Sequence, residues 1–391
     1  MPAHLTPVLR PDTTDQLCAI IRGARADGRM LAIRGGGSKA GFGASVEATD
    51  LDMRGFTGIV DYDPAELVLT VRAGTPLAEV EAALATQGQM LAFEPWDHGP
   101  LFGAAPGSAT IGGIVAAGVA GPRRLSAGGA RDHLLGFTAV SGKGERFVAG
   151  GRVVKNVTGF DLAKLMAGSW GRLAAMTELS LKVLPAPREQ ATLTAEGLDA
   201  AAAQALMLRA LGTAANVAAA AHLPAVLNAG RALTLLRLEG FGPSVEARCH
   251  ALIRDCADHP LQRLPEGEAA TCWQAICTAS PLDGPLLWRI PHPASSAAPV
   301  ADWLETNGAR WLIDWGGALL WTDWAGDAAA LRDHVAAAGG HAALVRAPAD
   351  MRACIPAQHP RAASVAALEA RIRRAFDPDG VFETGRFGAA G

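Results

Sequence analysis

No two of the six cysteines form a C-x-x-C pair, the usual sequence sign of an iron–sulfur cluster or a structural zinc site. Their spacing also does not indicate a small disulfide-stapled domain. We therefore expect reduced cysteines, no metal site in this chain and a cytosolic setting. The six are Cys18, Cys249, Cys256, Cys272, Cys277 and Cys354.

Long apolar runs and a surplus of basic residues are also missing. No uncharged apolar stretch approaches the ~20 residues that cross a bilayer, and the first residues have neither the basic region nor the apolar core of a signal peptide. The 35 Lys and Arg residues are scattered among 38 Asp and Glu residues, so no basic stripe for nucleic acid is expected. We expect a cytoplasmic protein without direct membrane insertion, peripheral at the inner membrane only through partners.

Half of the 391 residues are apolar and 19% are charged, which predicts well-buried cores in two or three domains. Strand-like and helix-like segments joined by glycine-rich loops predict an α+β domain over 1–187. After Pro185-Ala186-Pro187, a second alternation predicts a smaller α/β sandwich over 188–365. Residues 366–391 are predicted to be a C-terminal helix and tail.

The predicted elements follow from apolar periodicity and turn residues. Strands are expected at 30–33, 59–62, 67–71, 233–238, 286–290, 310–313, 319–321 and 342–345. Helices are expected to begin near residues 12 and 75 and to cover 244–257, 297–306, 328–338 and 366–376. The alanine-rich stretches 196–222 and 326–348 carry no functional information.

The first candidate binding loop is Arg34-Gly35-Gly36-Gly37-Ser38-Lys39, directly after a predicted strand. Consecutive glycines permit positive φ, so backbone amides can converge on phosphate oxygens. Ser38 adds a hydroxyl group and Lys39 a charge. The pattern is neither a P-loop nor a dinucleotide-binding G-x-G-x-x-G motif. Taken alone, a plain tight turn explains it equally well.

Two further segments are dense in small residues. In Pro106–Gly118, almost every side chain is small, which lets the backbone approach a large ligand closely. The bland alternative is a helix start packed tightly against a neighbour. In 155–173, Gly168 and Gly171 bracket another loop, and the strand-like run 176–185 follows.

The three segments, in this order, resemble the PCMH-type FAD-binding domain of the vanillyl-alcohol-oxidase superfamily. That family carries R-G-G-G-S/H, then P-G-x-x-T-I-G-G, then K-N-x-x-G-Y/F-D-L-x-K/R-L-x-x-G-S-x-G-x-L and T-E-x-x-L-K-V-x-P. The match covers about residues 12–187. Chain length and residues 168–171 are most similar to the small FAD-binding subunits of glycolate oxidases, which work beside a larger flavin subunit and an iron–sulfur subunit.

The resemblance implies a two-subdomain FAD domain, a cap domain and a C-terminal segment that returns to the FAD domain. It implies that the first loop holds the FAD pyrophosphate, that the second covers the pyrophosphate and flavin edge, and that Val153 and Gly159 approach the adenine. Thr177 would lie near the ribityl chain or ring. The implied cofactor-binding set is Arg34, Gly35, Gly36, Gly37, Ser38, Lys39, Pro106, Gly107, Ser108, Thr110, Ile111, Gly112, Gly113, Gly118, Val153, Gly159, Gly168, Gly171 and Thr177.

The sequence departs from the family in informative places. Covalent members attach flavin through a His in the first loop, sometimes with a Cys near the second segment. Here Ser38 follows Gly37, and no Cys lies between Cys18 and Cys249, so non-covalent FAD is expected. The ending 376–386 resembles F-D-P-x-G-V/I-F-N-P-G-R, with Glu383 and Thr384 in place of Asn and Pro. Arg172 stands where Thr is common; such an Arg reaches a phosphate or, more often, is solvated.

A substrate site is less well defined. The H-x-G-D-G-N-x-H-like metal motif of the larger 2-hydroxy-acid dehydrogenases is absent. Arg289, on a predicted strand, is the candidate catalytic residue, since a bidentate Arg suits a carboxylate; an interface ion pair is the alternative. Tryptophans at 303, 311, 315, 321 and 324 indicate core packing or a subunit contact.

These features favour a FAD-dependent oxidoreductase acting on CH–OH donors. By the resemblance, it oxidises glycolate to glyoxylate together with a larger flavin subunit and an iron–sulfur subunit. Two alternatives stay open. One is an assembly flavoprotein without its own substrate site. The other is a stand-alone oxidase acting on D-lactate or a sugar.

Overall fold

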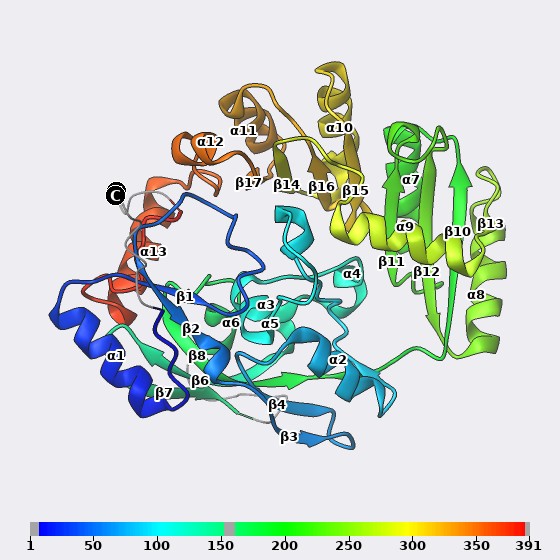
Figure 1. Cartoon of the computed structure of the whole chain (residues 1–391). Helices are drawn as coiled ribbons and strands as arrows, with labels where there is room; N and C mark the ends of the chain where they lie inside the picture. Colours follow the sequence, from blue (N-terminus) through cyan, green and yellow to red (C-terminus); the bar gives the residue numbers. More distant parts are fainter. Residues whose placement is uncertain (1–7, 152–160, 388–391) are drawn as a thin grey trace. The chain divides into compact units, whose positions relative to one another are not determined.

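The computed structural model describes residues 8–151 and 161–387, which form two compact units. The first unit contains the chain up to Ala120, Gly128–Ala186 and the segment from Pro360 onward; the second contains Gly121–Ala127 and Pro187–His359. Residues 121–127 thus belong to the second unit although the sequence on both sides belongs to the first. Each unit combines helices with sheets (Figure 1), which confirms the predicted α+β class.

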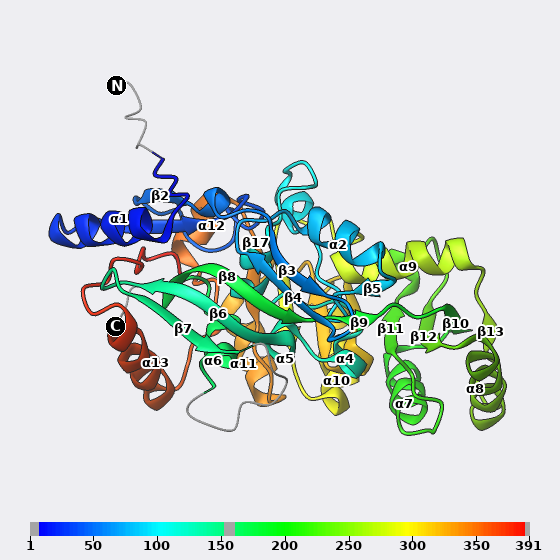
Figure 2. The ribbon, with the colours of Figure 1, turned by 90° about the horizontal axis from the view of Figure 1, so that it is seen from below.

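An antiparallel five-stranded sheet of order β3-β4-β8-β6-β7 is the centre of the first unit, and Figure 2 shows its strands side by side. The parallel pair β1-β2 and the short pair β5-β9 accompany it. The strands are β1 (Leu31–Arg34), β2 (Thr49–Asp52), β3 (Ile59–Asp63), β4 (Val68–Arg72), β5 (Gln89–Met90), β6 (Leu134–Ser141), β7 (Arg146–Gly150), β8 (Ala174–Lys182) and β9 (Leu184–Pro185). The helices are α1 (Thr14–Ala26), α2 (Leu77–Ala85), α3 (Ile111–Ala117), α5 (Ala130–His133), α6 (Leu162–Met166) and α13 (Ala363–Phe376).

The C-terminal segment contributes to the core of the first unit. Helix α1 begins where the Thr13 hydroxyl accepts a hydrogen bond from the Gln16 amide. Its apolar face buries Leu17 and Ile21 in one cluster with Val381 and Phe382. Strand β1 lies against the same segment, since the Leu31 amide donates to the Val381 carbonyl at 2.7 Å.

The second unit is built on one eight-stranded sheet of order β13-β10-β12-β11-β15-β16-β14-β17. The strands are β10 (Glu189–Glu196), β11 (Ala219–Leu223), β12 (Leu233–Gly240), β13 (Gln262–Arg263), β14 (Leu287–Pro291), β15 (Trp311–Asp314), β16 (Leu319–Thr322) and β17 (Ala343–Arg346). The helices are α4 (Arg124–Ala127), α7 (Ala200–Leu211), α8 (Gly242–Asp255), α9 (Glu266–Thr278), α10 (Ala297–Thr306), α11 (Ala328–Ala337) and α12 (Ala349–Cys354). Its main core joins one sheet face to α7, α8, α10 and α11.

Several elements of the second unit have no counterpart among the sequence-based predictions: β10, β11, β13, α4, α7, α9 and α12. In α7 and β11 the core side chains are mostly alanines, for example Ala203 and Ala220, both fully buried. Alanine side chains give a weak apolar pattern although they pack tightly here. Four of the five tryptophans at 303–324 are buried. Trp311 and Trp324 belong to the main core and Trp303 packs against it, as core packing predicts, whereas Trp315 and Trp321 lie outside that cluster.

Buried His222 makes the stability of the second unit depend on pH. Its side chain is 1% exposed, its Nδ1 lies 2.9 Å from the Thr234 hydroxyl, and burial lowers its pKa to about 4. The unfolded chain takes up this proton below about pH 6.5, whereas the folded chain does not until about pH 4. As the pH is lowered from about 6.5 to about 4, we expect the free energy of unfolding to decrease by up to ~3 kcal/mol.

The measurement is urea unfolding between pH 4 and pH 7.5. His222→Asn keeps a hydrogen-bonding group and removes the titration, so its curve should be flatter than that of the unchanged chain. The same substitution at the exposed His250 is the control for the change of residue type. Equal slopes for the His222 variant and the unchanged chain would contradict the assignment.

Candidate functional site

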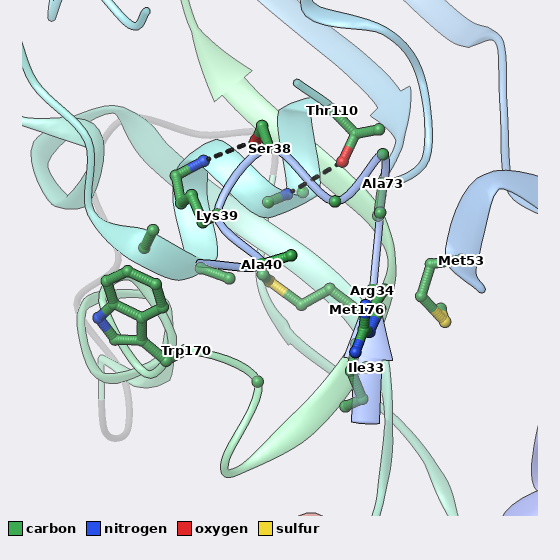
Figure 3. A pocket seen from close by; sticks show the side chains of 18 of the residues that line it. Ile33, Arg34, Ser38, Lys39, Ala40, Met53, Ala73, Thr110, Trp170 and Met176 are labelled. Carbon is green, nitrogen blue, oxygen red and sulfur yellow. Dashed lines mark hydrogen bonds between the residues drawn. The ribbon is translucent and has the colours of Figure 1, made fainter. Parts of the chain in front are cut away.

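A pocket in the first unit opens between the first glycine loop, α3 and β8. Its lining combines loop backbone with small and apolar side chains, and it encloses about 800 Å³, part of it open to solvent. A concave lining that is largely apolar, with a few polar groups, is typical of ligand sites. The lining residues are Ile33, Arg34, Gly35, Gly36, Gly37, Ser38, Lys39, Ala40, Met53, Ala73, Thr110, Gly112, Gly113, Ala116, Ala117, Trp170, Gly171, Ala174, Met176 and Arg386 (Figure 3).

The first loop packs directly onto the second glycine segment. A Cβ atom at Gly35 would overlap with the Thr110 hydroxyl, and one at Gly36 would overlap with the Ser108 carbonyl oxygen. Gly37 has a φ of +80°, which side-chain-bearing residues rarely adopt. At each position of the triplet, a different steric constraint therefore disfavours any residue larger than glycine. The tight-turn and ligand-loop interpretations are compatible, because the turn forms one wall of the pocket.

The backbone of this loop presents unpaired donors. Within residues 8–151 and 161–387, no acceptor takes a hydrogen bond from the amides of Gly36, Gly37, Ser38 or Lys39, whereas the Ala40 amide closes a turn on the Gly37 carbonyl at 2.9 Å. Successive free amides in a turn of this kind form a concave site for an anion. The loop can therefore bind phosphate oxygens.

Lys39 adds a buried charge beside these amides. Its side chain is 8% exposed, and its Nζ lies 3.3 Å from the Ser38 hydroxyl (Figure 3). Burial lowers its pKa to about 8; Asp97 opposes this shift and Arg386 adds to it. No carboxylate of the described chain forms an ion pair with Lys39. An anion in the pocket would supply the missing negative charge.

The second segment is held in place by a carboxylate. The Asp97 side chain accepts hydrogen bonds from the amides of Gly107 at 2.7 Å, Ser108 at 3.1 Å and Gly99 at 2.9 Å. The amides of Gly107 and Ser108 are therefore occupied. Pro106, Gly107, Ser108 and Ile111 do not line the pocket, and Ile111 is fully buried.

Helix α3 and its N-cap Thr110 form the part of the second segment that lines the pocket. The Thr110 hydroxyl caps this helix by accepting from the Gly113 amide at 3.4 Å (Figure 3). Gly112 lies so close to strand β4 and the following turn that a Cβ there would be 2.6 Å from the Ala73 carbonyl oxygen. Thr110, Gly112 and Gly113 are the predicted cofactor-binding residues of the second segment that line the pocket.

The third segment forms backbone hydrogen bonds with the end of α3. The amides of Gly168 and Trp170 donate to the carbonyls of Val115 at 3.0 Å and Ala116 at 2.8 Å. Gly118 and Gly168, both with positive φ, meet at this contact and lie outside the pocket lining. Gly171 and Trp170 line the pocket. Trp170 itself has a φ of +58°, an uncommon conformation for a large side chain.

Of the remaining candidates, Thr177 and Arg289 lie outside the pocket lining. On β8 successive side chains point to opposite faces, and Met176 lines the pocket whereas Thr177 donates to the Thr138 carbonyl at 3.2 Å. Val153 and Gly159 lie outside the described residues. Arg289 lies on β14 of the second unit, partly exposed, with its guanidinium carbon 4.8 Å from the Trp315 ring.

Two departures from the family pattern pair with each other. The Arg172 guanidinium donates to the Glu383 carboxylate at 2.7 Å, and Arg373 adds a second contact at 3.2 Å. The side chains of Arg172 and Glu383 are only 15% and 20% exposed. In the same segment, Arg386 lines the pocket and donates to the carbonyls of Lys39 and Phe42. The C-terminal segment therefore holds both the first loop and the third segment.

We expect the Arg172–Glu383 pair to show strong coupling in a double-mutant cycle. Arg172→Thr and Glu383→Asn, singly and together, should give a coupling free energy of about 1 kcal/mol or more in urea unfolding, because the pair is mostly buried. The exposed Arg29–Asp27 pair, 2.8 Å apart, is the control and should give less than ~0.5 kcal/mol. Equal coupling in the two cycles would contradict a special role for the Arg172–Glu383 pair.

Sequence reasoning missed several residues around the pocket. Met53, Ala73, Trp170, Met176 and Arg386 line it without being predicted. Asp97, which orders the second segment, stands in the run Pro95-Trp96-Asp97-His98 just before that segment, and an acidic residue next to a glycine-rich loop was an available signal. Within the described ranges, no group of three or more His, Cys, Asp or Glu residues could hold a metal ion, and no helix is long and apolar enough to cross a membrane.

A family model and several known proteins match this chain. Residues 6–150 match the model of an FAD-binding domain. The chain is 37% identical to the glycolate oxidase subunit GlcE of Escherichia coli, over 96% of this chain and 97% of that subunit. It is also 29% identical to the glycolate oxidase subunit GlcD of Bacillus subtilis, over 60% of this chain and 47% of that subunit.

Similarity to other relatives is partial. A D-2-hydroxyglutarate dehydrogenase of Xanthomonas citri is 31% identical over 45% of this chain and 36% of its own length. Among solved structures, an alkyldihydroxyacetonephosphate synthase has a TM-score of 0.66 at 14% identity, over 96% of this chain and 76% of that chain. At this identity the structural match shows the fold.

Proposed function

Because the chain belongs to the family of FAD-binding oxidoreductases that includes the glycolate oxidase subunit GlcE, we propose that it is the FAD-carrying subunit of an oxidase for a small 2-hydroxy acid. Glycolate, oxidised to glyoxylate, is the proposed substrate. Similarity over nearly the full length of both chains supports this choice, since the match to GlcD and to the dehydrogenase covers only part of each.

The observation that carries the proposal is the loop of free amides around Lys39. We assign the amides of Gly36–Lys39 and the Lys39 ammonium to the FAD pyrophosphate, because these unpaired donors need an anion and lie in the pocket. The apolar side chains of Met53 and Met176 are assigned to the less polar parts of the cofactor. Bound FAD supplies a two-electron acceptor for the hydride of a CH–OH group.

We propose that FAD binds without a covalent bond. Ser38 follows the glycine triplet where a covalent attachment would need a His, and the pocket lining contains neither His nor Cys. After acid precipitation, the flavin absorbance should stay in the supernatant. Yellow colour in the precipitate would contradict this assignment.

Substrate and partners are assigned by the same reasoning. Arg289 is the proposed ligand for the substrate carboxylate, since its guanidinium group forms no ion pair in the described chain and lies beside the Trp315 ring. A larger FAD-linked subunit and an iron–sulfur subunit are the proposed partners, to which electrons pass. Two of the relatives are named as different glycolate oxidase subunits, GlcE and GlcD, and this supports a multi-subunit assembly.

The test is the absorbance spectrum of the purified chain before and after anaerobic addition of glycolate. Flavin bands that bleach would support substrate oxidation by this subunit. Bands that persist until the larger subunit is added would place the chemistry in the partner and leave an assembly or electron-transfer role here. A colourless chain that takes up no added FAD would contradict the proposal.

A further inference from the structure

Arg289 projects from the sheet face opposite the main core. On β14, Trp288 and Ile290 are fully buried in that core, and strand alternation places Arg289 on the other face. The antiparallel register sets Arg289 opposite Trp321 of β16. Its guanidinium carbon lies 5.9 Å from the Trp321 ring and 4.8 Å from the Trp315 ring. The cation is therefore flanked by two aromatic rings.

The turn that carries Trp315 has an unusual backbone. Trp315, Gly316 and Gly317 have consecutive φ values of +53°, +60° and +103°. For tryptophan this conformation costs about 1–2 kcal/mol. It is held because the Trp315 amide donates to the Asp314 carboxylate at 2.7 Å and its indole N–H donates to the Gly121 carbonyl at 3.0 Å. Strain of this kind is concentrated at functional sites.

A second arginine reaches the same indole ring. Arg124, in the segment 121–127 that belongs to the second unit, has its guanidinium carbon 4.7 Å from the Trp315 ring. The Ser126 hydroxyl fixes this segment by donating to the Ala218 carbonyl at 2.9 Å. The guanidinium carbons of Arg124 and Arg289 therefore both lie less than 5 Å from the centre of the same indole ring.

Neither arginine has a direct polar partner in the described chain. Among the described residues, no group accepts a hydrogen bond from Arg124 or Arg289 and none forms an ion pair with them. Arg237 shows the contrasting arrangement: it stacks on Trp273 at 4.9 Å but also pairs with Glu239 at 3.0 Å. Two unpaired cations beside one ring repel each other, and an anion bound near them would offset this repulsion.

Electrostatics agree with this geometry. Burial, with the nearby charge of Arg124, lowers the pKa of Arg289 to about 10, and Asp314 opposes the shift. Arg289 remains a cation at neutral pH. A bound carboxylate would relieve the repulsion and could accept two parallel hydrogen bonds from a guanidinium group.

We infer that the second unit contains its own binding site for a small carboxylate anion, formed by Arg289 and Arg124 around the Trp315 ring. The inference deepens the proposed function. It rests on that function only where it identifies the anion as a 2-hydroxy or 2-oxo acid. The new element is Arg124: the site uses two arginines supplied by two different stretches of the chain. Binding requires no flavin.

The test is titration of the full chain with oxalate, a carboxylate that a CH–OH oxidase cannot oxidise. Binding is followed by tryptophan fluorescence, to which Trp315 and Trp321 contribute, and by calorimetry, with and without FAD. Saturable binding is expected in both forms. Arg289→Gln and Arg124→Gln should each weaken it at least tenfold. Arg231→Gln, which removes an exposed arginine paired with Glu196 and Glu268, should change it less than twofold.

Arg289→Lys separates loss of charge from misfolding. It keeps the cation without the planar fork, so its oxalate affinity should lie between those of the unchanged chain and Arg289→Gln. The absence of saturable oxalate binding, or Gln variants that bind as tightly as the unchanged chain, would overturn the inference. So would a loss confined to Arg289→Gln. Oxalate binding in a chain whose flavin never responds to glycolate would contradict the proposed function and leave this site intact.

Discussion

Replacing Gly36 by alanine is expected to abolish retention of FAD. The added Cβ would overlap with the Ser108 carbonyl oxygen, and a Cβ has no rotamer through which to avoid a backbone atom. The first loop must then move away from the second segment, which displaces the amides assigned to the pyrophosphate. We expect the dissociation constant for FAD to rise roughly 100-fold or more, about 3 kcal/mol. Flavin absorbance after gel filtration and titration with added FAD are the measurements.

A glycine in an open position provides the matched control. Gly267 lies in α9, and a Cβ there meets no atom within 4 Å. Gly267→Ala should leave the FAD affinity unchanged and should increase the free energy of unfolding by up to ~1 kcal/mol. If Gly36→Ala bound FAD as tightly as the control, contact between the two glycine segments could not be what shapes the pocket.

Replacing Lys39 by methionine should stabilise the FAD-free chain and weaken FAD binding. The pKa of Lys39 is about 8 in the folded chain and about 10.4 in an unfolded one. The folded state therefore holds this proton less tightly, and the charged lysine destabilises it below pH 8. At pH 7 the substitution should raise the free energy of unfolding by about 1–3 kcal/mol. It should also raise the dissociation constant for FAD about tenfold or more.

Denaturant unfolding without FAD, at pH 7 and pH 9.5, and FAD titration at pH 7 test the two effects. The stabilisation should shrink at the higher pH, where the folded chain has lost the proton. Lys164→Met is the control, since Lys164 is exposed and pairs with Asp161 at 3.1 Å; it should not affect FAD binding. A Lys39→Met chain that is less stable than the unchanged one at pH 7 would show that the buried charge does not destabilise the apo fold.

Local patterns in the sequence identified the elements with strong apolar periodicity. Helix α10, for instance, was expected at 297–306 and has these bounds. Alanine-rich α7 and β11 were missed because buried alanines produce little contrast between faces. Glycine spacing located the loops but not which backbone groups are free. The amides of Gly107 and Ser108 are occupied by Asp97, a partner that only the folded loop reveals.

Long-range partners account for the other differences. The substitution of Glu for Asn at 383 and the Arg at 172 each looked like an isolated departure from the family pattern. Their side chains are 211 positions apart in the chain and form one ion pair. Arg386 could be recognised as a pocket residue only once the C-terminal segment was known to contact Lys39 and Phe42. Contacts at such separation leave no periodic signal in a single sequence.

The division of each unit into separate stretches of chain has a consequence for synthesis. The ribosome releases residues 34–39 early, but Arg386, which fixes their loop, emerges only after the whole of 187–359. The contacts between the first loop and Arg386 therefore cannot form while the second unit is being translated. We therefore expect the complete pocket to form only after residue 386 has been synthesised.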